Sequence, residues 1–98
     1  EKMKIVVKIH VYSMENPKGF IYEKVYNLAV VPTIGEKIKD SLFAESKKVI
    51  DVIYDFSLEE CYVILESKEF PHDRFSGHIQ EVADMHNWIQ STQIEKKI

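Results

Sequence analysis

The segment near the start of the chain places the strongest constraint on the fold. Four aliphatic residues alternate there with mostly polar neighbours, interrupted only by Val6: Ile5, Val7, Ile9 and Val11. Successive side chains of a β-strand point to opposite faces, so a spacing of two is typical of a strand with one buried face. We therefore predict that the chain opens with a strand that contributes a row of side chains to a hydrophobic core.

A hairpin is predicted next. Pro17 suits the second position of a type I turn and Gly19 suits its exit, so residues 16–19 are expected to turn and residues 20–31 to return as a strand. Pairing residues whose numbers sum to 35 sets Val7 opposite Leu28 and Ile9 opposite Tyr26. A slip of one residue stays open, because a hairpin register depends on the turn geometry.

Proline and glycine then interrupt the strand pattern at residues 32–38. Pro32 cannot donate to a sheet ladder, and Gly35 permits a bend, so we expect a corner with Gly35 in a backbone conformation that other residues disfavour. Strands are expected to resume at residues 47–56 and 61–67, joined by a short polar loop. Five short strands predict a strongly twisted antiparallel sheet or a small SH3-like barrel.

The pattern changes after Pro71 to a helical period. Apolar residues and one histidine recur at spacings of three and four, with further large apolar side chains beside them, which predicts an amphipathic helix over about residues 74–92. The predicted docking stripe comprises Phe75, Ile79, Val82, Met85, Trp88 and Ile89. We expect this stripe to pack on the sheet or, alternatively, on a second subunit, and residues 93–98 to form a short tail. The predicted fold is thus mainly β with a C-terminal α-helix (α+β).

Length and charge bound the function. With 98 residues, 45% of them hydrophobic and 30% charged, the chain is expected to form a single domain over residues 1–98. The net charge is −3, which argues against affinity gained by neutralising phosphates. The charge is uneven: residues 1–39 hold seven lysines and four glutamates, whereas residues 40–73 hold nine carboxylates and three lysines.

Cysteine usage and hydropathy predict a cytoplasmic protein. Cys61 is the single cysteine, so no internal disulfide can form, and its strand pattern predicts a buried structural thiol. No run of about 20 apolar residues exists for a membrane span, and residues 1–9 mix charges with aliphatics, unlike a signal peptide.

The sequence contains no catalytic or cofactor motif. Gly19, Gly35 and Gly77 are too far apart for a phosphate-binding loop, and no Gly-x-Ser-x-Gly elbow occurs. His78 and His86 are eight residues apart, which places them on different faces of a helix, so we predict no metal and no cofactor. An acid/base site around His72, Asp73 and His78 stays open as a weaker alternative.

Two sets of residues are candidate binding surfaces. The first hairpin carries a basic and aromatic set, as platforms for single-stranded nucleic acid do: Lys8, His10, Tyr12, Lys18, Tyr22 and Lys24. Its simpler interpretation is that the aromatic residues face the core and the lysines protect an edge strand. The second surface is an acidic run that could attract a basic protein partner or form a solvated face: Asp51, Asp55, Glu59, Glu60, Glu66 and Glu69.

The segment 31–38, followed by residues 49–55, resembles small SH3-like β-barrel proteins found among short bacterial and mobile-element reading frames. In these proteins a proline and a Gly-acidic pair open a strand, as Pro32, Gly35 and Glu36 do here. The resemblance implies a fold class and no catalytic residue.

These observations predict a small non-enzymatic binding protein. Its most favoured partner is another protein, including a second copy of itself, because sheet edges and apolar helix faces are association surfaces. The alternative is a nucleic-acid-associated small barrel that uses the first hairpin.

Overall fold

The computed structural model describes residues 3–14, 16–40, 42–43, 45–69 and 81–91. The strands are β1 (Met3–Tyr12), β2 (Phe20–Leu28), β3 (Lys37–Ile38), β4 (Lys47–Asp55), β5 (Glu60–Leu65), β6 (Lys68–Glu69) and β7 (Ile89–Ser91). Residues 81–85 are helical. The strand predictions for residues 47–56 and 61–67 are confirmed to within two residues.

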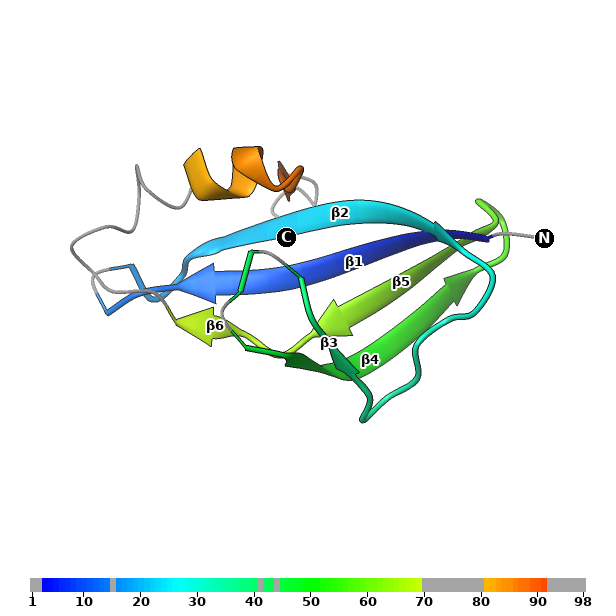
Figure 1. The fold of residues 1–98 in the computed structure, drawn as a ribbon. Helices are drawn as coiled ribbons and strands as arrows, with labels where there is room; N and C mark the ends of the chain where they lie inside the picture. The colour runs from blue at the N-terminus through cyan, green and yellow to red at the C-terminus, as the bar shows by residue number, and fades with distance from the viewer. Residues whose placement is uncertain (1–2, 15, 41, 44, 70–80, 92–98) are drawn as a thin grey trace.

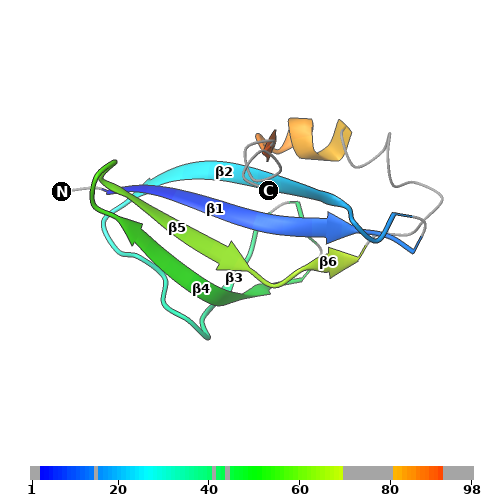
Figure 2. The ribbon, with the colours of Figure 1, turned by 180° about the vertical axis from the view of Figure 1, so that it is seen from behind.

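The strands form one curled, mixed sheet in the order β3-β4-β5-β1-β2-β7, a half-barrel in shape, and β6 also pairs with β1 (Figures 1 and 2). The predicted antiparallel sheet is therefore wrong, because the sheet is mixed and curls into a half-barrel. β5 runs parallel to β1, with Ile5 beside Cys61 and Val7 beside Val63. A parallel pair requires a long crossover connection, so local strand patterns could not show it.

The register of the first hairpin also differs from the prediction. Val7 lies opposite Lys24 and Ile9 opposite Tyr22, a shift of four residues along β2. The turn forms earlier than predicted, because Ser13 and Asn16 exchange two backbone hydrogen bonds of 3.1 and 3.2 Å. Since the shift is an even number of residues, each side chain keeps its predicted face.

The core lies on the inner face of the curl. The predicted row of β1 is confirmed, since Ile5, Val7, Ile9 and Val11 are at most 3% exposed. The other strands contribute Tyr22, Val49, Cys61, Val63 and Leu65. The β3–β4 connection covers this layer with Leu42 and Phe43, and the segment before β7 covers it with Ala83 of the short helix and Trp88. The rings of Phe43 and Trp88 meet edge to face, 6.1 Å apart, so segments far apart in sequence close the same core.

The predicted helix over residues 74–92, packed on the sheet, is wrong. The described helical segment ends at residue 85, and β7 begins at Ile89. Asn87 adopts a left-handed conformation (φ 67°). The amide of Trp88 donates to the carbonyl of Ala83 (2.8 Å), and the amide of Asn87 donates to the carbonyl of Asp84 (3.2 Å). This pair of bonds is the Schellman motif, in which Asn can replace Gly, and it ends a helix.

The corner after β2 is confirmed. Gly35 has φ 97°, a conformation that favours glycine, and its amide donates to the carbonyl of Val49 at 2.9 Å. The corner thereby brings residues 35–38 alongside the start of β4. The resemblance to SH3-like barrels stays a prediction.

Candidate protein-binding surface

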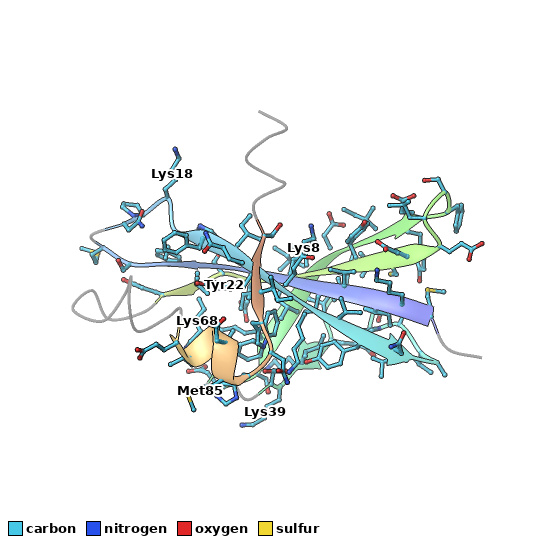
Figure 3. All side chains as sticks on the ribbon, turned by 90° about the horizontal axis from the view of Figure 1, so that it is seen from above. Lys8, Lys18, Tyr22, Lys39, Lys68 and Met85 are labelled. Carbon is cyan, nitrogen blue, oxygen red and sulfur yellow. The ribbon has the colours of Figure 1, made fainter. Side chains whose placement is uncertain are left out.

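The structure does not bring the six predicted hairpin residues to one surface. Lys8, His10 and Tyr12 alternate with core residues and so face outward, whereas Tyr22 is 1% exposed in the core. Lys24 shares the inner face with Tyr22. Lys18 belongs to the turn and projects away from the sheet (Figure 3).

The outward lysines of β1 already have acidic partners. Lys4 pairs with Glu60 at 2.9 Å, and Lys8 lies 3.8 Å from Glu23 and 5.1 Å from the centre of the Tyr62 ring. The hydroxyl of Tyr62 donates to Glu60 at 2.7 Å, and this bond, with burial as a smaller cause, raises the pKa of Tyr62 to about 12. The positive charge of this face is therefore largely balanced within the chain.

A buried polar cluster centres on Asp40. Its carboxylate accepts hydrogen bonds from the Trp88 indole (3.0 Å), the Lys24 ammonium (3.0 Å), the Tyr26 hydroxyl and the Leu42 amide (3.0 Å). Burial opposes ionisation of this carboxyl, but the hydrogen bonds outweigh it and hold the pKa of Asp40 well below its usual range. The cluster joins β2 and the β3–β4 connection to the residue before β7, so we assign Lys24 and Asp40 a structural role.

The predicted helix stripe separates into different environments. Trp88 is buried at 1% exposure, and Val82 packs on the core from a partly buried position. Met85 and Ile89 are 75% and 70% exposed, and Met85 points away from the sheet (Figure 3). Phe75 and Ile79 lie outside the described residues, as do His72, Asp73 and His78.

Most of the exposed large apolar side chains among the described residues belong to the start of β1, the second half of β2, the loop after β2, the second half of β4 and the β4–β5 turn. The start of β1, the end of β2 and the β4–β5 turn lie at the same end of the sheet (Figure 1), and Ile34 of the loop lines a cavity together with Tyr54 of β4. We call this region the open end. It comprises Met3, Val25, Leu28, Val30, Ile34, Ile53, Tyr54, Phe56 and Leu58. Phe56 is 86% exposed, Ile34 64% and Leu58 60%. Exposed apolar groups gathered in one region mark interaction sites, whereas isolated ones need no explanation.

The β4–β5 turn holds its apolar side chains in place. One oxygen of Asp55 accepts hydrogen bonds from the amide of Ser57 (3.1 Å), the hydroxyl of Ser57 (2.6 Å) and the amide of Leu58 (3.2 Å). Such an Asx turn fixes a tight bend. Phe56 and Leu58 are therefore displayed on an ordered turn, and the Phe56 ring lies 6.4 Å from that of Tyr54.

Two cavities flank Tyr54 at the open end. One, of about 390 Å³, is lined by Met3, Lys4, Tyr54, Asp55, Phe56, Glu59 and Glu60. The other, of about 370 Å³, is lined by Thr33, Ile34, Val52 and Tyr54. The first contains three carboxylates and one lysine, so three members of the predicted acidic run meet beside exposed aromatic rings.

The described residues show no cluster of metal-binding side chains. Within these ranges no three His, Cys, Asp or Glu side chains lie close enough together to hold a metal ion. Cys61 is buried, as predicted, and burial raises the pKa of its thiol, which disfavours the reactive thiolate. Nor does any helix in the described part have the length and apolar composition to cross a bilayer.

Sequence reasoning missed the apolar half of the open end. Phe56, Leu58 and Ile34 have no period that marks them as exposed, because their position depends on the corner at Gly35 and on the Asp55 turn. The available signal was the pair of apolar residues within the polar loop 56–60.

Comparison of the chain with protein-family models, with curated proteins and with solved structures gives no match. Functional inference therefore depends on the geometry of the open end.

Proposed function

We propose that this protein is a small, non-enzymatic, cytosolic module that binds another protein through the open end. The observation that carries the proposal is the exposure of Phe56, Ile34 and Leu58 beside two cavities, on a turn that Asp55 holds in shape. Full burial of a large apolar side chain is worth about 1.5 to 3 kcal/mol. These side chains stay exposed in the folded chain, so a partner that covers them gains the free energy of their burial on binding.

The charge of the open end favours a protein partner over a nucleic acid. Asp55, Glu59 and Glu60 outnumber Lys4 around the larger cavity, and carboxylates repel phosphates. The alternative nucleic-acid surface is the first hairpin, and two of its lysines already have acidic partners: Lys8 lies near Glu23, and Lys24 pairs with Asp40. Two copies of this chain facing each other through the same acidic surface would also repel, so a different protein is the better partner.

Paired substitutions test the proposal. Phe56→Ser and Ile34→Ser each remove an exposed apolar side chain from the open end, and Met14→Ser and Met85→Ser remove equally exposed ones elsewhere (79% and 75%). Each protein is immobilised and incubated with an extract of the cells that naturally make it, and the retained proteins are quantified by mass spectrometry. We expect one partner to be retained by the parent and both control variants and to be lost with both open-end variants. Equal retention by all four variants would show that the open end is not the binding site.

A further inference from the structure

We infer that the partner binds as an additional β-strand along the free edge of β4, with an extended segment in which apolar residues alternate with lysine or arginine. The inference rests on the proposed function, since Tyr54 of β4 belongs to the open end. It specifies the partner's conformation and chemistry.

Over its second half, β4 has no paired strand on one side among the residues that the structure describes. β5 pairs with one side of β4 from Val49 to Asp55, with a register shift between Val49 and Asp51. β3 pairs only with Lys47 and Lys48 on the other side. Gly35 and Glu36 extend that contact to Val49 by backbone hydrogen bonds of 2.9 and 2.8 Å. Beyond Val49, no strand in the described part of the chain pairs with this side of β4. Such an edge is a template for an added strand.

The backbone groups of Val52 point to this edge. The amide of Val52 donates to the carboxylate of Asp51 at 2.9 Å, and a donor directed at β5 would be used in the ladder instead. The register shift between Val49 and Asp51 reverses the alternation, so Val52 faces the same side as Val49. Beyond the shift, neighbouring residues direct their backbone groups to opposite sides, so Tyr54, two residues after Val52, also faces the edge. In the free protein the Asp51 carboxylate accepts the hydrogen bond of the Val52 amide. An added strand whose carbonyl accepts that hydrogen bond instead leaves the Asp51 carboxylate available to a basic side chain.

The two faces of the edge demand different side chains. On the inner face, Val52 and Tyr54 line the cavity of about 370 Å³ together with Thr33 and Ile34, so the added strand must place apolar side chains there. On the outer face, Asp51, Ile53 and Asp55 follow the register opposite Ile64, Tyr62 and Glu60. The two aspartates on that face favour basic side chains. Because strand side chains alternate with a period of two, the matching segment alternates apolar and basic residues.

Three synthetic heptapeptides probe this directly by amide chemical shifts of the labelled full chain. The first alternates lysine and isoleucine, the second has the same composition with all lysines at one end, and the third alternates glutamate and isoleucine. We expect the first peptide to shift the amides of Val52, Tyr54 and Ile34 and to bind at least threefold more tightly than the second. The third peptide should not bind.

Two variants provide the control for charge. Asp51→Lys should weaken binding of the alternating lysine peptide at least threefold, whereas Glu45→Lys, the same change of charge beyond the other end of β4, should not. A second edge variant, Val52→Pro, removes the outward amide, and proline is tolerated in an edge strand when its nitrogen faces outward. It should abolish the preference for the alternating order, while its circular dichroism spectrum shows that the fold is retained.

Equal affinity for the two lysine peptides would show that charge alone explains binding, and would overturn the inference. Chemical-shift changes confined to residues outside the open end would also overturn it, as would the absence of binding by the alternating lysine peptide. These outcomes leave the proposed function standing if the natural partner is still lost with Phe56→Ser. Conversely, retention of that partner by Phe56→Ser and Ile34→Ser refutes the proposed function whatever the peptides do.

Discussion

The two ends of the sheet use their side chains in opposite ways. At the end with the β1–β2 turn, polar groups join neighbouring segments: Nε2 of His10 donates to the carbonyl of Lys18 at 2.7 Å, and Nδ1 lies 3.2 Å from the hydroxyl of Ser67. At the open end, apolar side chains such as Phe56 face water while Asp55 holds the turn beneath them. In line with the proposed function, we interpret the first end as serving folding and the second as presenting a surface to a partner.

The strongest test of this difference is Gly19→Ala at the β1–β2 turn. Gly19 has φ 63°, and a Cβ atom there would lie 2.0 Å from the carbonyl oxygen of Val11, which is backbone and cannot rotate away. Backbone strain and steric overlap each cost about 1 to 3 kcal/mol, so we expect a loss of about 3 kcal/mol in the free energy of unfolding. Urea denaturation measures it. An unchanged midpoint would show that this turn is not required for the fold.

A smaller effect is expected from Asp40→Asn in the buried cluster. The pKa of Asp40 is lowered in the folded protein, so its contribution to stability is complete above the unfolded value of about 4 and is lost as the pH falls below it. Hydrogen bonds to a charged group are worth about 1.5 to 3 kcal/mol, so we expect the variant to lose about 2 kcal/mol at pH 7.

The same variant also predicts a change in pH dependence. Urea midpoints measured from pH 7 down to pH 2.5 should fall less steeply below pH 4 for Asp40→Asn than for the parent. If the two curves run parallel, the hydrogen bonds to Asp40 do not lower the pKa of its carboxyl in the folded protein.

Gly35→Val tests the corner beside the open end. Gly35 has φ 97°, but nothing lies within 4 Å of the position of an added Cβ atom. Only backbone strain is therefore expected, at a cost of about 1 kcal/mol. Thermal unfolding compares this variant with Gly19→Ala, and a loss at Gly35 as large as that at Gly19 would contradict the distinction between the two sites.

The smallest effect on stability is expected at the open end itself. The double variant Phe56→Ser and Leu58→Ser removes side chains that are 86% and 60% exposed, so the free energy of unfolding should change by no more than about 0.5 kcal/mol. Denaturant unfolding checks this value against the double variant Met14→Ser and Met85→Ser. If the free energy of unfolding falls by more than about 2 kcal/mol, these side chains stabilise the fold, which contradicts a role of the open end in binding alone.

Local patterns predicted the parts of the fold that depend on local chemistry. The alternation at Ile5 to Val11, the corner at Gly35 and the strand from Lys47 each follow from side-chain period or backbone freedom. The parallel pairing of β1 with β5 could not be predicted, because it depends on how the chain crosses over. The register shift arose because Ser13 and Asn16 closed the turn before Pro17.

The helix prediction failed at a residue that carried a readable signal. The apolar spacing continued to Ile89, but Asn87 tolerates the left-handed conformation that ends a helix, and Trp88 is buried beside Phe43. At the candidate site, the acidic run predicted three of the charges around the larger cavity. Exposure of Phe56 and Ile34 could not be predicted, since it results from tertiary packing.

Site-specific photocrosslinking tests the central claim most directly. A photoreactive phenylalanine analogue is placed in turn at the positions of Phe56, Ile34, Met14 and Met85, all strongly exposed, in the cells that naturally express the chain. We predict that irradiation joins the same partner protein to positions 56 and 34 and not to positions 14 and 85. Crosslinks to a common partner only from positions 14 or 85, or equal yields from all four positions, would contradict the assignment of the open end as the binding surface.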